Sequence, residues 1–302
     1  MFLLNQKSHE TVAIMDEYDL SGRNIILTGA GRGLGRAMTE ALTEAGANVV
    51  AAAHIADDFP ELEAACASNP GNIHCVTADI RSGEDCDRIV SEALCAFGAI
   101  HGLVNNAGLT FTYIWPDGHK TEAWRATGEM PKFWEASDEV IQNVLEANFI
   151  GADKLARRVT PLMVDQGWGR IVNVTTMYRT MTKQGSSPYG PSKAALEVAT
   201  EIWNKDLGGT GVTVNILNPG AGAATPGMSE EMKQRDETLE TPVLIGADLM
   251  KAPIVWLMSD VTNEVSGMRY DAKPWDPSKP AADEAERIGA KAGVLLYSMP
   301  DY

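Results

Sequence analysis

Short apolar runs alternate with helix-length segments along most of this chain, and this alternation constrains the fold more than any other feature. Polar and apolar residues do not alternate within the runs, so each expected strand is buried on both faces. Strands of this kind, separated by helices, form a parallel sheet. The expected strands are residues 24–28, 48–53, 73–77, 100–104, 170–175, 212–217 and 266–270. The expected helices are residues 37–45, 84–97, 140–163, 188–207 and 247–258.

The pattern predicts an α/β protein: one doubly wound domain over residues 1–302, with a seven-stranded, mostly parallel sheet and helices on both faces. Its core covers about residues 20–272. Three segments fall outside the alternation, namely an aromatic-rich insertion at 109–137, a polar, Met-rich loop at 221–241 and a tail at 273–302. Loops of this length in a compact domain are usually functional or mobile, so the insertion and the loop are candidates for the walls of a site.

Composition narrows the class of partner. The chain has 302 residues, of which 44% are hydrophobic and 22% charged, as in a globular protein with a sizeable core. Its net charge of −16 repels nucleic acid and anionic lipid, so we expect a small-molecule substrate and no nucleic-acid or membrane partner. Phe2–Leu4 are followed at once by Asn5–Lys7, which leaves no hydrophobic region for a signal peptide, and we expect a cytoplasmic protein.

The cysteines do not indicate a metal centre. All four lie within a short stretch, and no two have the CxxC spacing of a zinc site or a redox motif. They are Cys66, Cys75, Cys86 and Cys95. We therefore expect no bound metal and interpret these residues as small core or surface side chains.

A glycine-rich segment joins the first strand to the first helix. A dinucleotide pyrophosphate requires this setting, because glycines admit the phosphate close to the backbone and the helix N-terminus offers unpaired N–H groups. The strand and helix on either side make a merely tight turn a poor explanation. The candidate cofactor-binding residues here are Thr28, Gly29, Gly31, Arg32, Gly33, Leu34 and Gly35.

This TGxxxGxG spacing resembles the short-chain dehydrogenase/reductase family, and the resemblance extends over about residues 20–272. Asn105-Asn-Ala-Gly108, directly after the fourth expected strand, is similar to the family's second cofactor motif. The resemblance implies that this motif, through Asn106, Ala107 and Gly108, stabilises the sheet and lines the cofactor path. It also implies that Asp79 and Ile80, after the third strand, lie against the adenine ring.

Tyr189 and Lys193 form the pair expected to perform proton transfer. They are four residues apart at the start of an expected helix, so both side chains lie on one face, one turn apart. A nearby ammonium favours phenolate and draws the phenol pKa toward working pH. The family resemblance implies that Tyr189 protonates the carbonyl oxygen during reduction and removes the hydroxyl proton during oxidation, while Lys193 also holds the nicotinamide ribose.

The resemblance assigns two further catalytic residues. Thr176, thirteen residues before Tyr189, stands where the family usually has the serine that hydrogen-bonds the substrate oxygen, and the adjacent Thr175 is the alternative. Threonine keeps the hydroxyl donor, but its methyl group narrows the pocket. Asn148 matches the family's asparagine that orders a water beside the lysine, and Asn143 is the alternative.

The turn after the sixth expected strand resembles the family's turn beside the nicotinamide. It contains Pro219 and Gly220. The family often has a threonine four residues after this glycine, but this chain has Ala224 there and Thr225 one residue later. A one-residue insertion would make Thr225 the contact to the carboxamide.

The end of the second expected strand predicts a preference for NADP(H). An NAD-specific site usually has an acidic residue there, which binds the adenosine ribose and repels a 2′-phosphate. This chain has Ala53, followed by His54, and Arg32 of the glycine loop is a second cation able to reach the phosphate. NAD(H) stays possible, because Asp57 or Asp58 could supply the missing carboxylate if the following loop curls back.

The resulting hypothesis is an oxidoreductase of the alcohol dehydrogenase and carbonyl reductase type. The insertion contains Trp115, Trp124, Phe133 and Trp134, so we expect it to cover the pocket and favour a bulky, apolar or aromatic substrate, although a subunit-contact loop is the alternative. A catalytically silent dinucleotide-binding sensor or scaffold on the same fold is the competing function. Relatives are often tetramers formed through their two long helices, so a homotetramer or dimer is expected.

Overall fold

The computed structural model describes residues 18–239 and 243–293 of the chain, so the expectation for the N-terminal leader lies outside the described residues. In this part of the chain the sheet has eight strands in the order β3-β2-β1-β4-β5-β6-β7-β8, all parallel except β8. The strands are β1 Asn24–Thr28, β2 Asn48–Ala53, β3 Ile73–Thr77, β4 Gly102–Asn105, β5 Gly169–Val174, β6 Val212–Asn218, β7 Met268–Asp271 and β8 Ala290–Lys291. The predicted fold class, a doubly wound α/β domain, is confirmed.

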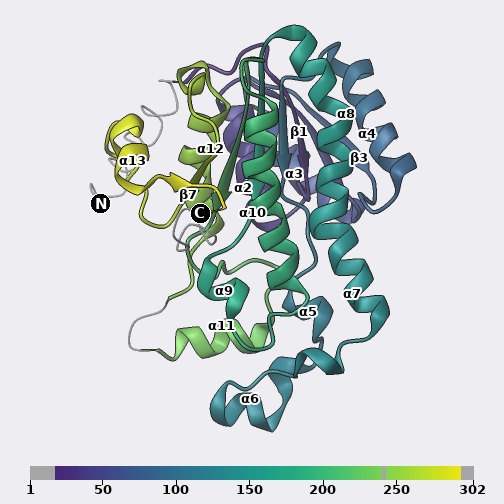
Figure 1. Cartoon of the computed structure of the whole chain (residues 1–302), viewed down its shortest axis with the longest axis vertical. Coiled ribbons are helices and arrows are strands. Elements are labelled where there is room, and N and C mark those ends of the chain that lie inside the picture. Colours follow the sequence, from purple (N-terminus) through teal and green to yellow (C-terminus); the bar gives the residue numbers. More distant parts are fainter. Residues whose placement is uncertain (1–17, 240–242, 294–302) are drawn as a thin grey trace, which may run out of the picture.

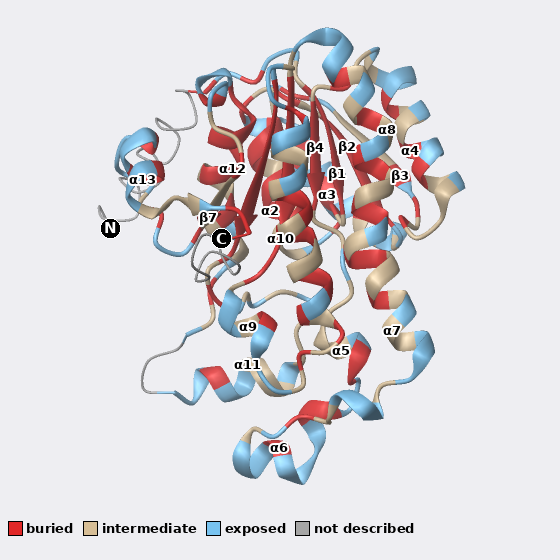
Figure 2. Cartoon of the chain, in the orientation of Figure 1, coloured by how far each residue is buried: buried red, intermediate tan, exposed pale blue. Residues whose placement is uncertain are grey.

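Helices cover both faces of the sheet (Figure 1). One face packs against α2 (Gly33–Glu44), α3 (Phe59–Cys66) and α12 (Lys251–Met258). The other packs mainly against α4 (Gly83–Phe97) and α8 (Gly151–Gln166), with α10 (Tyr189–Asp206) beside them. The central strands are therefore buried throughout (Figure 2).

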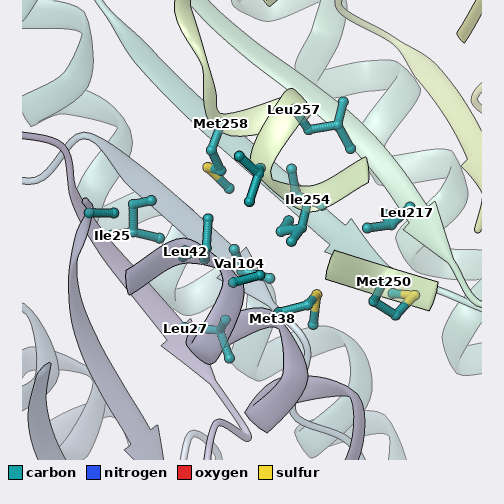
Figure 3. Packing of buried hydrophobic residues seen from close by; sticks show 14 of the residues in the cluster. Ile25, Leu27, Met38, Leu42, Val104, Leu217, Met250, Ile254, Leu257 and Met258 are labelled. Atoms are coloured by element: carbon teal, nitrogen blue, oxygen red, sulfur yellow. The ribbon is translucent and has the colours of Figure 1, made fainter. Parts of the chain in front are cut away.

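The core on the first face is built from aliphatic side chains of strands and helices that are distant in sequence. Figure 3 shows Leu27 of β1 and Val104 of β4 next to Met38 and Leu42 of α2, with Ile254 of α12 above them. Each of these side chains is almost completely buried. Burial of a side chain of this size stabilises the fold by about 1.5–3 kcal/mol, so these contacts hold α2 and the adjoining glycine loop at a fixed height above the sheet.

The structure differs from the predicted elements in several places. Helix α3 was not predicted, and the helix expected over 140–163 is divided into α7 (Asp138–Leu145), a π-helical turn (Glu146–Ile150) and α8. The loop expected at 221–241 contains α11 (Glu230–Glu237). The tail contains α13 (Ala281–Ile288) and the two-residue strand β8, which pairs antiparallel with β7 and extends the sheet beyond the seven expected strands.

The insertion folds into short helices beyond the carboxyl ends of the strands. Its α5 (Phe111–Ile114) and α6 (Glu122–Thr127) lie below the sheet in Figure 1, with α9 (Tyr178–Thr182) and α11. A separate apolar cluster holds this region together and includes Ile114, Trp115, Trp124, Met130 and Val144. The insertion thus has its own small core next to the carboxyl ends of the strands.

None of the helices in the described residues combines the length and apolar character needed to span a membrane.

Candidate active site

A cavity of about 340 Å³ opens at the carboxyl edge of the parallel strands. Its wall is formed by the glycine loop, the segments that follow β2, β4, β5 and β6, and the insertion. Of the residues proposed from sequence, those on the wall are Gly29, Gly31, Arg32, Gly33, Leu34, Gly35, Ala53, His54, Asn106, Ala107, Gly108, Thr176, Tyr189, Lys193, Pro219 and Thr225. The structure therefore brings most of the predicted cofactor and catalytic residues into one continuous space.

The geometry of the glycine loop fits a bound dinucleotide. Gly29 and Gly33 have positive φ angles of 66° and 56°, which favour glycine. A Cβ atom at Gly35 would lie 2.0 Å from the Gly29 carbonyl oxygen, so only glycine allows α2 to start so close to β1. No side chain caps the N-terminus of α2, and its first turn has no acidic residue. Backbone N–H groups there are available to an anion such as a pyrophosphate.

Thr28 lies behind this wall and connects β1 to the segment after β4. Its hydroxyl accepts hydrogen bonds from the backbone N–H groups of Asn106 and Ala107, both at 3.1 Å, and donates to the Val104 carbonyl at 3.3 Å. The side-chain amide of Asn106 donates to the carbonyls of Thr28 and Gly29. These bonds join the two predicted cofactor motifs to each other.

Asp79 and Ile80 are not on the cavity wall. The Asp79 carboxylate is bound by the Arg81 guanidinium at 2.6 Å, which lowers the pKa of that carboxyl group. Ile80 is buried, and its side chain packs against Gly151 at the start of α8. The side chains of Asp79 and Ile80 therefore contact other residues of the protein and do not line the cavity.

The proposed acid and the proposed hydroxyl donor are in direct contact. The Thr176 hydroxyl lies close enough to the phenol of Tyr189, the first residue of α10, to lower the pKa of that phenol by hydrogen bonding. Burial raises the pKa of Tyr189 to about 12, against the smaller lowering by Thr176. Thr175, the alternative to Thr176, is engaged elsewhere, because its hydroxyl donates to the Glu197 carboxylate at 2.7 Å.

Lys193 lies one helical turn after Tyr189 and is 4% exposed. Its Nζ donates to the Val174 carbonyl at 2.8 Å, which holds the ammonium at the end of β5. Burial lowers the pKa of Lys193 to about 8. The expectation that the ammonium would dominate the phenol pKa is not met in this geometry, since burial is the larger effect on both groups.

Asn148 lies in the π-helical turn and is buried away from the cavity wall. Its Oδ1 accepts from the Leu109 N–H at 2.6 Å, and its Nδ2 donates to the Leu109 carbonyl at 3.0 Å and to the Ser192 hydroxyl at 3.0 Å. Asn143, the alternative, accepts instead from Arg81. Asn148 therefore connects the start of the insertion to α10, beside Lys193.

The loop after β6 folds back over the glycine loop. The side chain of Thr225 lies next to Gly33, where an added Cβ would approach it at 3.1 Å. Pro219 lines the cavity, whereas Gly220 has a φ angle of 72° and packs against Asp271 and Lys273. Thr225 thus closes the cavity above the expected pyrophosphate position.

Asp58 is the one acidic residue on the cavity wall in the described part of the chain. The loop after β2 curls back so that the Asp58 side chain lies over Gly31, and its carboxylate forms an ion pair with Arg32. Asp57 does not line the cavity. Of the two aspartates considered from sequence, the structure therefore selects Asp58.

The opposite end of the cavity is formed by residues that the sequence analysis did not assign. They include Phe111 and His119 of the insertion, Thr180 and Lys183 around α9, and Met228 and Met232 around α11. The four aromatic residues expected to cover the pocket do not line it. Trp115 and Trp124 are buried in the separate apolar cluster, and Phe133 and Trp134 are exposed.

Comparison with known proteins identifies this arrangement. Residues 23–236 match the family model described as short chain dehydrogenase. The chain is 27% identical to a 3-oxoacyl-[acyl-carrier-protein] reductase from Thermotoga maritima, covering 82% of this chain and 95% of the relative. It is 32% identical to a 2,5-dichloro-2,5-cyclohexadiene-1,4-diol dehydrogenase from Sphingobium indicum, covering 82% and 94%.

Solved structures agree with the observed architecture. A short-chain type dehydrogenase/reductase from Mycobacterium marinum superimposes with a TM-score of 0.72 at 22% identity, covering 86% of this chain and 98% of that one. A Beutenbergia cavernae protein that was solved with NADP bound at low occupancy has a TM-score of 0.69 at 27% identity, covering 84% and 96%.

Proposed function

Because this chain belongs to the short-chain dehydrogenase/reductase family and is an NAD(P)-dependent oxidoreductase of alcohols and carbonyl compounds, we propose that it works with NADP(H) on a bulky, largely apolar substrate. The single observation that supports the chemistry best is that Thr176, Tyr189 and Lys193 meet at one wall of the cavity, with Lys193 buried one helical turn after Tyr189. This is an acid, a hydroxyl donor and a cation in one place.

The proposed roles follow from this geometry. The cofactor, when bound, supplies or accepts a hydride. Tyr189 donates its phenolic proton to the substrate oxygen in reduction and takes the hydroxyl proton in oxidation, while Thr176 holds that oxygen by a hydrogen bond. Burial opposes formation of the phenolate and Thr176 favours it. The positive charge of Lys193, one helical turn away, is proposed to act in the same direction as Thr176.

Asn148 is proposed to act by positioning. Both atoms of its amide bind the backbone of Leu109, and the amide nitrogen also donates to Ser192, the neighbour of Lys193 in α10. This arrangement holds Gly108, where an added Cβ would lie 3.6 Å from Lys193 Nζ. Asn148 thereby fixes the segment that lines the cofactor path relative to Tyr189 and Lys193.

Three observations support NADP(H). Ala53 at the end of β2 has no carboxylate to repel a 2′-phosphate, and both His54 and Arg32 line the cavity nearby. Asp58 is the opposing feature, but its charge is compensated by Arg32. We propose that Arg32 turns from Asp58 to the phosphate when NADP(H) binds.

The proposed substrate class follows from the far end of the cavity. Phe111 packs against the Tyr189 ring at a centroid distance of 5.0 Å, and Met228 and Met232 line the wall beside it. Aromatic and thioether side chains offer an adaptable apolar surface. A substrate with a cyclic or branched carbon frame fits this surface.

Tyr189→Phe tests the proposed chemistry. With a panel of alicyclic and aromatic ketones, we expect kcat to fall about 10²- to 10⁴-fold while cofactor binding persists. Tyr178→Phe is the matched control, because Tyr178 is exposed on α9 and is not on the cavity wall. A wild-type protein that binds cofactor but reduces or oxidises no member of the panel would instead be a dinucleotide sensor.

A further inference from the structure

Lys183 places a positive charge at the substrate end of the cavity. It follows α9, lines the cavity and lies with its Nζ 4.2 Å from the centroid of the Phe111 ring. The same ring packs against Tyr189 at 5.0 Å. One aromatic ring thus connects the ammonium to the proposed acid, and both lie within the span of a small substrate molecule.

This ammonium is not neutralised by the protein around it. Among residues 18–239 and 243–293, no ion pair or hydrogen bond of the Lys183 side chain is found, and its contact is with the Phe111 face. Partial burial lowers its pKa, and the charge of Arg179 lowers it further. Lys183 is an exposed residue on the cavity wall, so its ammonium can be reached by an anionic ligand.

The surrounding polar groups also suit an anion. His119 is buried at the wall and its Nδ1 is 2.9 Å from the Ser229 hydroxyl, while burial lowers the pKa of the imidazole. Thr180 lines the cavity one turn before Lys183. The single acidic residue on the described wall, Asp58, lies at the glycine loop and is paired with Arg32. The described wall at the substrate end therefore has a cation and hydroxyl groups but no carboxylate, and the nearby Glu231 acts on His119 from outside the wall.

We propose that Lys183 binds a carboxylate of the substrate, so that the preferred substrates are hydroxy acids or oxo acids with an apolar carbon frame. This inference rests on the proposed function and names its substrate class. The reacting carbonyl or hydroxyl lies at Tyr189, the carbon frame lies against Phe111 and the methionines, and the carboxylate lies at Lys183. In a chain of net charge −16, an uncompensated cation within the cavity also attracts an acidic substrate that the remaining surface repels.

A binding experiment tests this without turnover. Titration calorimetry would compare cyclohexanecarboxylate with cyclohexanecarboxamide, which has the same frame and no charge, and with cyclohexyl phosphate. We expect the carboxylate to bind wild type about 10- to 100-fold more tightly than the amide, as for a charge-assisted contact. Lys183→Gln should remove this preference, and Lys183→Arg should keep most of it.

The matched control is Lys120→Gln, since Lys120 is also on the insertion side but is exposed and paired with Asp117 at 3.1 Å. Its carboxylate preference should equal that of wild type. Equal binding of acid and amide by wild type would overturn the proposal, as would an undiminished preference in Lys183→Gln. Tighter binding of the phosphate than of the carboxylate would overturn the choice of ligand.

The result of the Lys183 binding test can be separated from the result of the test of the proposed function. Tyr189→Phe should keep the carboxylate preference while losing turnover. If Tyr189→Phe turns over ketones normally, the catalytic assignment fails and the binding result still decides on Lys183. In steady-state assays, matched oxo acids and their methyl esters should differ in kcat/KM by a similar factor in wild type, and this ratio should approach one in Lys183→Gln.

Discussion

Arg32 and Asp58 form a two-point ion pair beside the glycine loop, with Nε to Oδ2 at 2.5 Å and Nη2 to Oδ1 at 2.6 Å. The proposed anchor of the 2′-phosphate is therefore held by a carboxylate of the protein. Asp58 raises the pKa of the Arg32 guanidinium, so this cation stays charged at any working pH. A bidentate pair of this kind competes directly with a phosphate for the same guanidinium.

Removing that competition should strengthen the preference for NADP(H). In Asp58→Asn, Arg32 is released and the repulsion of a 2′-phosphate disappears, so the NADPH to NADH ratio of kcat/KM should rise by about tenfold, equivalent to about 1.4 kcal/mol. Asp57→Asn is the control, since Asp57 does not line the cavity. The rise should come from a higher kcat/KM for NADPH. A rise that comes only from a lower kcat/KM for NADH would show that Asp58 binds the ribose and that NAD(H) is the natural cofactor.

Lys193 should set the alkaline limit of cofactor use. Its pKa of about 8 means that it is an ammonium below this pH and a neutral amine above it. We expect kcat/KM for the cofactor, which reports the free enzyme, to be constant below about pH 7 and to fall about tenfold per unit as the pH rises beyond 8.

The arginine variant separates this titration from other alkaline effects. Lys193→Arg keeps its charge to far higher pH, so kcat/KM for the cofactor should not fall near pH 8 in this variant, even if its value at neutral pH is lower than in wild type. A flat wild-type profile between pH 6 and 10 would mean that Lys193 does not titrate in this range.

The buried ion pair between Glu197 and Arg269 should stabilise the catalytic segment. Arg269 also donates to the Thr176 carbonyl at 3.0 Å, behind the hydroxyl that faces Tyr189. Arg269→Met leaves the buried Glu197 carboxylate without its ionic partner, although the Thr175 hydroxyl still donates to it, and should cost about 3–5 kcal/mol of unfolding free energy. The double variant Glu197→Leu/Arg269→Met should recover most of this loss.

Measuring both the unfolding free energy and kcat then separates an effect on stability from an effect on the position of Thr176. We expect the double variant to remain about tenfold slower in kcat, because the Thr176 carbonyl has lost its donor. Full recovery of both stability and kcat would limit the role of Arg269 to folding.

The insertion should be held by Trp115. Its Nε1 donates to the Gly185 carbonyl at 3.1 Å, which ties the insertion to the segment before Tyr189. Trp115→Ala should cost about 3–5 kcal/mol within the local cluster. We expect faster amide exchange over residues 109–137 and a raised KM for the substrate, with little change in Tm, because the sheet core is separate. Trp134, exposed at the surface, is the control, and Trp134→Ala should match wild type in both measurements.

The parts of the structure that could be predicted are those with a local signal. The bounds of β1 and β2 agree with their apolar runs, because both faces of each strand require apolar residues. The bounds of β3 also agree, although this edge strand is only partly buried. Helix α3 was missed since it buries only Phe59, Leu62 and Cys66, too few to give a helical period.

The residues of the site also fall into those with a local sequence pattern and those without one. The glycine loop and the pair Tyr189 and Lys193 each lie within one short segment, so their spacing is visible in the sequence. Phe111 and Lys183 reach the cavity only because loops fold back over the sheet edge, and no local pattern indicates this. Asp58 could be named from the sequence only on the condition that its loop curls back. The aromatic residues of the insertion were assigned to the pocket by composition, whereas the structure uses Trp115 and Trp124 to build the insertion itself.

The π-helical turn around Asn148 makes this part of the chain sensitive to its length. A π turn contains one residue more than an α turn, and here it allows α7 and α8 to bury Val144 and Leu155 while Asn148 stays directed at Leu109. Deleting one residue between 145 and 151 would rotate one helix relative to the other by about 100°. Point substitutions on the exposed surface of this helix are therefore tolerable where a single-residue deletion is not.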